Sequence, residues 1–230
     1  MPFPTTRWSL VLSARGDAPA ARRAMQELLS TYWPPLYAFA RSKGLPREDA
    51  EDAVQVLCAK LVVADFAGRV AADQGRLRSY LRASLANQLR GDHERRVRQK
   101  RGGGAVIVDL EPALLDRLDA AAADDPGDAF DRAWAQAVMA RALLRLEAEF
   151  TQEDRSGPFD VVRAYFSGQE LPPYAELAAA HDTSVARIKS LLHRARARFR
   201  HHLQQEVADT VGEGGDVDAE LAVLIGVLSS

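Results

Sequence analysis

Apolar side chains recur along most of this 230-residue chain at the three- and four-residue spacing of a helix face. The spacing predicts helices over residues 20–42, 47–64, 76–98, 131–150 and 159–166. No alternating pattern of strands and turn signals competes with them, so we expect an all-α fold. Within the first helix, Pro34 and Pro35 predict a restart or kink, because proline lacks an amide donor and clashes with the preceding turn.

Residues 47–64 show the clearest buried face. Its apolar members follow the i, i+3, i+4, i+7 spacing and are Ala50, Ala53, Val54, Leu57, Cys58, Leu61 and Val62. Cys58 is the only cysteine, which excludes an intrachain disulfide and a multi-cysteine metal site. We expect it to be a buried structural thiol. Asp52 and Gln55 lie on the opposite, polar face.

The most specific local pattern begins at Pro172-Pro173. It predicts a short helix over 174–180, a turn at 181–183, and a helix from Val185 to at least Leu203 with Ser184 as N-cap. A short helix, a tight turn and a longer basic helix are typical of a helix-turn-helix, which presents its second helix to the DNA major groove. An αα-hairpin within a helical bundle is the alternative interpretation.

Composition changes after Gly102-Gly103-Gly104 indicate the domain organisation. We expect two small helical domains, residues 1–101 and 129–205, joined by a flexible acidic linker over 102–128 and followed by a C-terminal extension over 206–230. A short apolar helix is expected near 110–118. The apolar spacing of the extension predicts a short amphipathic helix after the glycine-rich break. This helix would either fold back onto the second domain or dock a regulator.

The formal net charge of −2 hides a strong segregation of charge. Residues 76–101 hold nine Lys or Arg against two acids, and residues 184–202 hold six against none. The intervening stretch is acidic. Two basic blocks separated by acids favour two contacts with a polyanion. Solvated helix faces that alternate in sign are the other interpretation.

Several function classes lack their sequence signals. No apolar run approaches the roughly 18 residues of a membrane span, and the N-terminus has no basic-then-apolar leader, so no membrane insertion and a cytoplasmic location are expected. His193, His201 and His202 lack metal-ligand spacing, and Gly102-Gly103-Gly104 is no phosphate loop. We therefore expect no metal, no cofactor and no enzymatic activity.

Three motifs together resemble one family. Residues 174–178 (YAELA) with 187–196 (RIKSLLHRAR) resemble the helix-turn-helix with which extracytoplasmic-function sigma factors, of the sigma-70 family, read the promoter −35 element. Upstream, 47–55 (REDAEDAVQ) with 59–61 (AKL) resembles the family's polymerase-binding helix. Residues 75–81 (GRLRSYL), continuing to Arg101, resemble its −10-reading and DNA-melting helix. The motifs occur in the family's order and span about 170 residues.

The resemblance implies a function and its residues. The chain would direct core RNA polymerase, through its β′ and β subunits, to promoter DNA by reading the −35 duplex and opening the −10 region. The implied polymerase contacts are Asp52, Gln55 and Lys60. The implied −10 contacts are Arg76, Arg78, Tyr80, Arg82, Asn87, Arg90, Arg95 and Arg98. The implied −35 contacts are Arg187, Lys189, Ser190, His193, Arg194 and Arg196.

Three departures and two alternatives accompany this interpretation. Val56 and Cys58 stand where the family usually has a glutamate and an aromatic residue, and Asp182 stands where its turn often has glycine. The Asn and Asp pattern of the family's −10-reading helix is blurred here, with Asn87, Gly91 and Asp92 as the nearest candidates. The main alternative is a stand-alone helix-turn-helix transcriptional regulator that binds duplex DNA without polymerase, usually as a dimer on palindromic half-sites. A pure protein-interaction module would leave both basic blocks unexplained. An anti-sigma factor or other regulator is a further expected partner.

Overall fold

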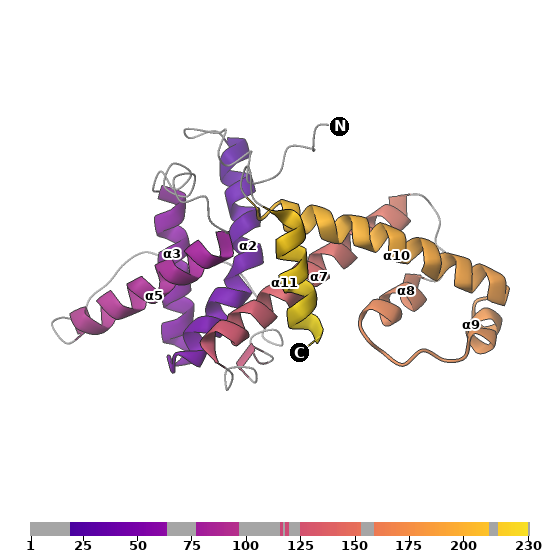
Figure 1. Ribbon diagram of the computed structural model, residues 1–230, viewed down its shortest axis with the longest axis horizontal. Helices are drawn as coiled ribbons and strands as arrows, with labels where there is room; N and C mark the ends of the chain where they lie inside the picture. The colour runs from indigo at the N-terminus through magenta and orange to yellow at the C-terminus, as the bar shows by residue number, and fades with distance from the viewer. Residues whose placement is uncertain are drawn as a thin grey trace. The chain divides into compact units, whose positions relative to one another are not determined.

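The computed structural model describes residues 19–63, 77–96, 116, 118–119, 125–152, 159–211 and 216–229. All regular secondary structure in these ranges is α-helical, which confirms the all-α prediction. None of the helices in the described ranges is both long and apolar enough to cross a membrane. The described residues form two compact units, one made of those up to Ala137 and from Val207 onwards, the other of Val138–Glu206 (Figure 1).

Three helices that pack against one another form the centre of the first unit: α2 (Pro19–Ser42), α3 (Arg47–Val63) and α5 (Leu77–Arg96). The buried face predicted for α3 is confirmed from Ala50 to Leu61. Facing side chains complete this core, and the largest of them are Tyr32, Trp33, Leu36, Tyr37, Leu77, Leu81 and Leu85. Because these leucines bury one side of α5, the residues on its opposite side face solvent.

Pro34 and Pro35 lie inside α2, and the helix does not restart there. Every residue from Thr31 to Ala40 is buried, including both prolines. Trp33 and Tyr37 stack with ring centroids 5.2 Å apart across the proline pair. Burial of this aromatic segment offsets the hydrogen bonds that the two prolines remove.

Helix α7 (Pro126–Gln152) begins five residues before the predicted start. Its first turn has a local cause: the Asp125 side chain accepts a hydrogen bond from the Gly127 amide at 2.8 Å, and Pro126 occupies the first helical position. The first unit takes the N-terminal part of α7, where Phe130 and Trp134 are fully buried. Phe130 meets Phe39 of α2 edge-on.

Among the described residues of the expected linker, Asp116, Leu118 and Asp119 contact this unit. Leu118 is buried, and the Asp119 carboxylate accepts hydrogen bonds from the Tyr37 hydroxyl at 2.7 Å and the Arg41 Nε at 2.6 Å. Asp116 pairs with Arg47 at 3.1 Å. Burial alone would raise the pKa of Asp119, but its hydrogen bonds from Arg41 and Tyr37 and the nearby cations outweigh burial and lower it. Most of the expected linker lies outside the described residues.

The C-terminal extension forms helix α11 (Val217–Ser229), as the apolar spacing predicted. The Asp216 side chain caps it by accepting a hydrogen bond from the Ala219 amide at 2.9 Å. The prediction that the extension folds onto the second domain is wrong: α11 belongs to the first unit, where Glu220 pairs with Arg78 of α5.

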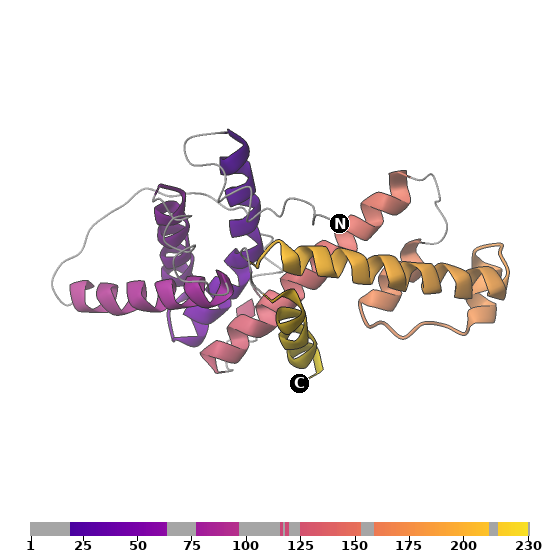
Figure 2. The same ribbon diagram turned by 45° about the horizontal axis from the view of Figure 1, so that its top comes forward.

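The second unit consists of the C-terminal part of α7 with α8 (Phe159–Phe166), α9 (Tyr174–Ala180) and most of α10 (Val185–Ala208). In Figure 1 and in Figure 2, α8 and α9 lie along one side of α10. Their shared core includes Leu146, Phe150, Val162, Leu177, Ile188, Leu192 and Phe199. The buried Glu206 carboxylate binds Arg141 at 2.9 Å and also Arg145, which joins α10 to α7.

The connection between α9 and α10 has the geometry that the sequence predicted. The Ser184 hydroxyl accepts a hydrogen bond from the Arg187 amide at 3.2 Å, so Ser184 is the N-cap of α10. Asp182 adopts a positive φ of 46°, in the left-handed region that glycine enters most easily and aspartate at modest cost. The bounds of α9 and the start of α10 are those predicted.

Candidate nucleic-acid interface

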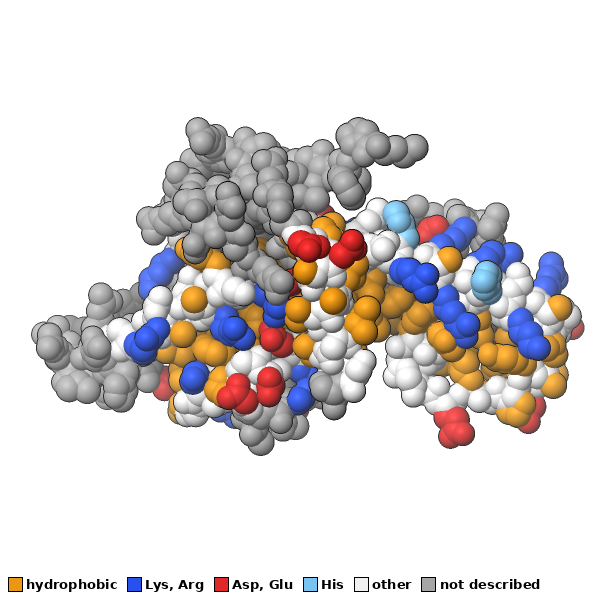
Figure 3. Space-filling view, in the orientation of Figure 1, with side chains coloured by type: hydrophobic (Ala, Val, Ile, Leu, Met, Phe, Trp, Pro, Cys, Tyr) orange, Lys and Arg blue, Asp and Glu red, His pale blue; other side chains and the backbone are white. Residues whose placement is uncertain are grey.

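The six side chains proposed to contact the −35 element all lie on the solvent side of α10. Its core side is formed by Ile188, Leu191, Leu192, Ala195 and Phe199, all buried. The six exposed residues are Arg187, Lys189, Ser190, His193, Arg194 and Arg196. Lys and Arg side chains line α10 in the space-filling view (Figure 3). The structure therefore brings the whole predicted set together on one helix surface.

The distribution of these side chains around α10 follows from 3.6 residues per turn. Ala186, Ser190 and Ala197 lie directly opposite the buried face and are small and exposed. Lys189 and Arg196 lie on one flank of this line of small residues, and Arg187 and Arg194 lie on the other. We call this surface the cationic face of α10. Its centre holds these small side chains together with the larger His193, and cations are directed to both sides. The small side chains let the helix approach a groove closely, and His193 would project into that groove.

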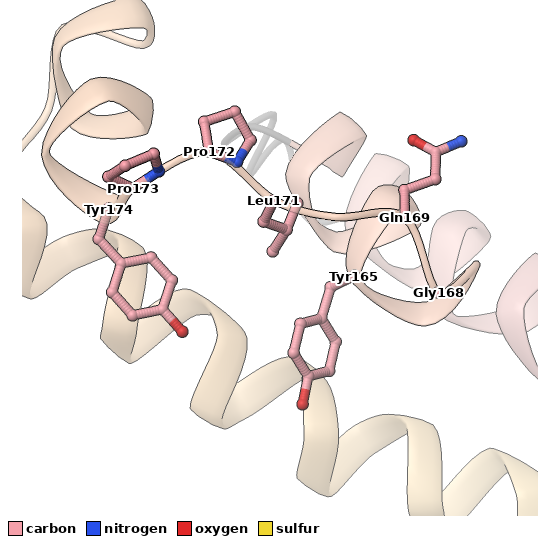
Figure 4. A pocket seen from close by; sticks show the side chains of 7 residues that line it. All are labelled: Tyr165, Gly168, Gln169, Leu171, Pro172, Pro173 and Tyr174. Carbon is pink, nitrogen blue, oxygen red and sulfur yellow. The ribbon is translucent and has the colours of Figure 1, made fainter.

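One flank of the cationic face lies against aromatic side chains of the same unit. The Arg196 guanidinium lies over the Tyr165 ring, 4.8 Å from its centroid, and the Lys189 ammonium lies 5.9 Å from that of Tyr174. Both tyrosines point towards α10 (Figure 4). They line an open hollow of about 460 Å³ together with Leu171 and the proline pair. These contacts restrict the two cations without burying them.

The cations of α5 do not share one environment. Asn87 and Arg90 are exposed, and Arg90 donates to the Asn87 side-chain oxygen at 2.5 Å. Arg82 and Tyr80 are half-buried, and Arg82 lies 5.9 Å from the Phe130 ring centroid. Asn87 and Arg90 thus form an exposed polar patch on this helix.

Arg78 departs most from the expectation of an accessible phosphate contact. It is only 7% exposed and pairs with Glu220 of α11 and Asp131 of α7, each at 2.5 Å. In this arrangement its guanidinium is not accessible to a phosphate. Arg76 and Arg98 lie outside the described residues, and Arg95 lies in α5 with its side chain outside the description.

The three predicted polymerase contacts of α3 differ in their surroundings. Asp52 is exposed and Gln55 is half-buried on adjacent parts of the helix surface. Lys60 is exposed but donates a hydrogen bond to the Gln88 side-chain oxygen of α5 at 2.9 Å. Gln88 in turn donates to the Ala53 carbonyl oxygen at 2.7 Å. Lys60 therefore contributes to the α3–α5 contact, whereas Asp52 is open to a partner.

Two features of this interface were not assigned from the sequence. The tyrosines beside α10 precede and follow a loop, and their contact with Lys189 and Arg196 depends on how that loop returns to α10. The carboxylates around Arg78 come from segments 53 and 142 residues away along the chain. The uniformly acidic charge of the tail was the one available signal for Glu220, because no Lys or Arg follows Arg200.

Within the described ranges no three His, Cys, Asp or Glu side chains are grouped so that they could hold a metal ion. Comparison of the chain with protein-family models, with curated proteins and with solved structures found no match.

Proposed function

We propose that this chain is a sigma factor of the extracytoplasmic-function type, which binds core RNA polymerase and directs it to promoters without catalysing a reaction itself. The observation that carries the proposal is the cationic face of α10, which follows a short helix and a left-handed turn residue. In this proposal α9 and α10 form a helix-turn-helix whose second helix enters the major groove at the −35 element.

The second support is the exposed patch on α5. Asn87 offers hydrogen bonds to a base edge, and Arg90 offers charge to a phosphate of opened DNA. In the proposed assembly α3 contacts the β′ subunit through Asp52 and Gln55, which places α5 beside the −10 region. The two reading surfaces then belong to different compact units of one chain.

A selection from random duplex DNA separates this proposal from a stand-alone transcriptional regulator. The full chain is incubated with the library alone and together with core polymerase. A sigma factor enriches a bipartite sequence only with core enzyme, because the proposed −10 contact requires opened DNA. Enrichment of palindromic half-sites by the chain alone would favour the regulator and contradict the proposal.

A further inference from the structure

The C-terminal helix α11 is attached to the first unit through a buried carboxylate. Glu220 is 2% exposed, and its Oε1 accepts a hydrogen bond from the Arg78 Nε at 2.5 Å. The Arg78 Nη1 donates to Asp131 at 2.5 Å. A single guanidinium of α5 is therefore held between a carboxylate of α11 and a carboxylate of α7.

The surroundings keep Arg78 charged and enclosed. Burial alone would lower its pKa, but Glu220 and Asp131 outweigh burial, so the pKa is raised. The guanidinium also lies 5.1 Å from the Trp134 ring centroid. Arg82 approaches Asp131 at 4.0 Å, so two arginines face two carboxylates. The cluster is close to neutral and holds Arg78 away from solvent.

The apolar side chains of α11 are buried to different degrees, and Val217, Leu221, Val223 and Val227 are half-buried. Leu224 is fully buried, whereas Ile225 is 61% and Leu228 is 47% exposed. A 13-residue helix is marginal in water without tertiary contacts. Glu220 and Leu224 are the two buried side chains of α11 and, with its half-buried apolar residues, attach the helix to the first unit. Such a small attachment can open without unfolding the core of α2, α3 and α5.

We propose that α11 is an internal competitor for nucleic acid, in which Glu220 occupies Arg78 in the free chain and withholds it from a DNA phosphate. The inference rests on the proposed function of α5 in binding opened DNA. A carboxylate and a phosphate both accept charge-assisted hydrogen bonds from a guanidinium, so they compete for the same donor. The apparent affinity for opened DNA equals the affinity of the chain with α11 released multiplied by the fraction of chains in that state.

The test measures binding of the full chain with core polymerase to a fluorescent DNA duplex that contains a pre-opened bubble. Glu220→Gln keeps the shape of the side chain and removes its charge. Leu224→Ala weakens the attachment of α11 without altering the ionic cluster. Asp218→Asn is the matched control, since it removes one charge from an exposed position of the same helix.

We expect Glu220→Gln and Leu224→Ala each to tighten bubble binding, by up to about tenfold if α11 is attached in about nine chains of ten. Asp218→Asn should leave affinity near the wild-type value. In an Arg78→Ala background the gain from Glu220→Gln should disappear, because the competed cation is absent. Circular dichroism of each variant establishes that the helical fold is retained.

The outcomes separate this inference from the proposed function. If the wild-type chain binds core enzyme and bubble DNA, but Glu220→Gln and folded Leu224→Ala bind no tighter, the competitor role is contradicted while the sigma-factor proposal stands. The role is equally contradicted if Asp218→Asn gives the same gain as Glu220→Gln. If the wild-type chain neither binds core enzyme nor confers bubble binding, both proposals fail together.

Discussion

Side-chain size matters as much as charge on the cationic face of α10. Ala186, Ser190 and Ala197 are small, so on either side of the central His193 the helix backbone can approach base edges closely. Arg187 and Arg194 on one flank differ from Lys189 and Arg196 on the other, because the second pair lies over tyrosine rings. Arg194 therefore has the greater freedom to adjust to a base.

Replacing Arg194 tests whether it reads sequence. If its guanidinium binds guanine O6 and N7, Arg194→Ala should relax preference at one promoter position by about 1–3 kcal/mol. Selection from a randomised −35 library with core enzyme measures this directly. If the variant instead binds all sequences more weakly by the same factor, with a shallower salt dependence, Arg194 contacts a phosphate and base reading is contradicted. Arg200→Ala, at an exposed position further along α10, is the control.

Cys58 gives a pH-dependent prediction. Burial raises the pKa of its thiol to about 12. The folded state therefore holds the proton more tightly than the unfolded state, whose thiol titrates near pH 8.5. The thiol's contribution to stability is complete below that pH and is lost as pH rises towards 12.

Two measurements check the Cys58 prediction. Iodoacetamide at pH 8 should modify the native chain far more slowly than the urea-unfolded chain, because the native thiol is buried and protonated. Between pH 9 and 11, Cys58→Ala should lose less stability than the wild type. Equal labelling of native and unfolded chains would mean that Cys58 is accessible.

Among the secondary-structure elements, the presence of most helices could be predicted from the spacing of apolar residues. Periodicity located α3, α8, α9 and the start of α10, because each has a buried face or a sequence-local cap. The start of α7 was missed, although Asp125 before Pro126 is a helix-start signal, because the surrounding acidic and alanine-rich stretch was interpreted as linker.

The exposed surface of α10 was predictable for a simple reason. Its buried residues are strictly periodic, so the remaining positions had to face solvent. The same reasoning could not place Arg78, since its position next to the buried Leu77 is also compatible with exposure. Its partners Asp131 and Glu220 come from distant segments, and local patterns carry no information about such pairings.

The turn before α10 tests the link between backbone geometry and stability. Asp182 has a positive φ, which glycine adopts without strain and alanine adopts at a cost of about 1 kcal/mol. Asp182→Gly should thus leave the free energy of unfolding unchanged or raise it, whereas Asp182→Ala should lower it by about that amount. Urea denaturation measures both, and a more stable alanine variant would contradict the assigned conformation.

For the molecule as a whole, charge is distributed so that a nearly neutral chain presents cations where the proposal needs them. The formal net charge is −2, yet α10 exposes cations on both flanks of its outer surface. Two acidic side chains occupy buried positions: Glu206 binds two arginines in the second unit, and Glu220 binds Arg78 in the first. Charge reversal at an exposed acid should therefore affect partners rather than folding.

Asp52 is such an acid. Asp52→Arg should weaken binding of core polymerase at least severalfold while the melting temperature stays near that of the wild type, because the side chain is exposed. Glu48→Arg, an identical charge reversal at another exposed position of α3, is the matched control. Binding can be measured with labelled chain titrated with core enzyme. Equal effects of both variants would indicate a general charge effect and remove Asp52 from the contact.

Run-off transcription tests the central claim most directly. Purified core polymerase is supplied with templates that carry the sequences enriched from random DNA, with and without the full chain. The account predicts specific transcripts from a fixed start site only when the chain is present, and their loss with Arg194→Ala on the same template. Transcription that is unchanged by the chain, together with no association between chain and core enzyme, would contradict it.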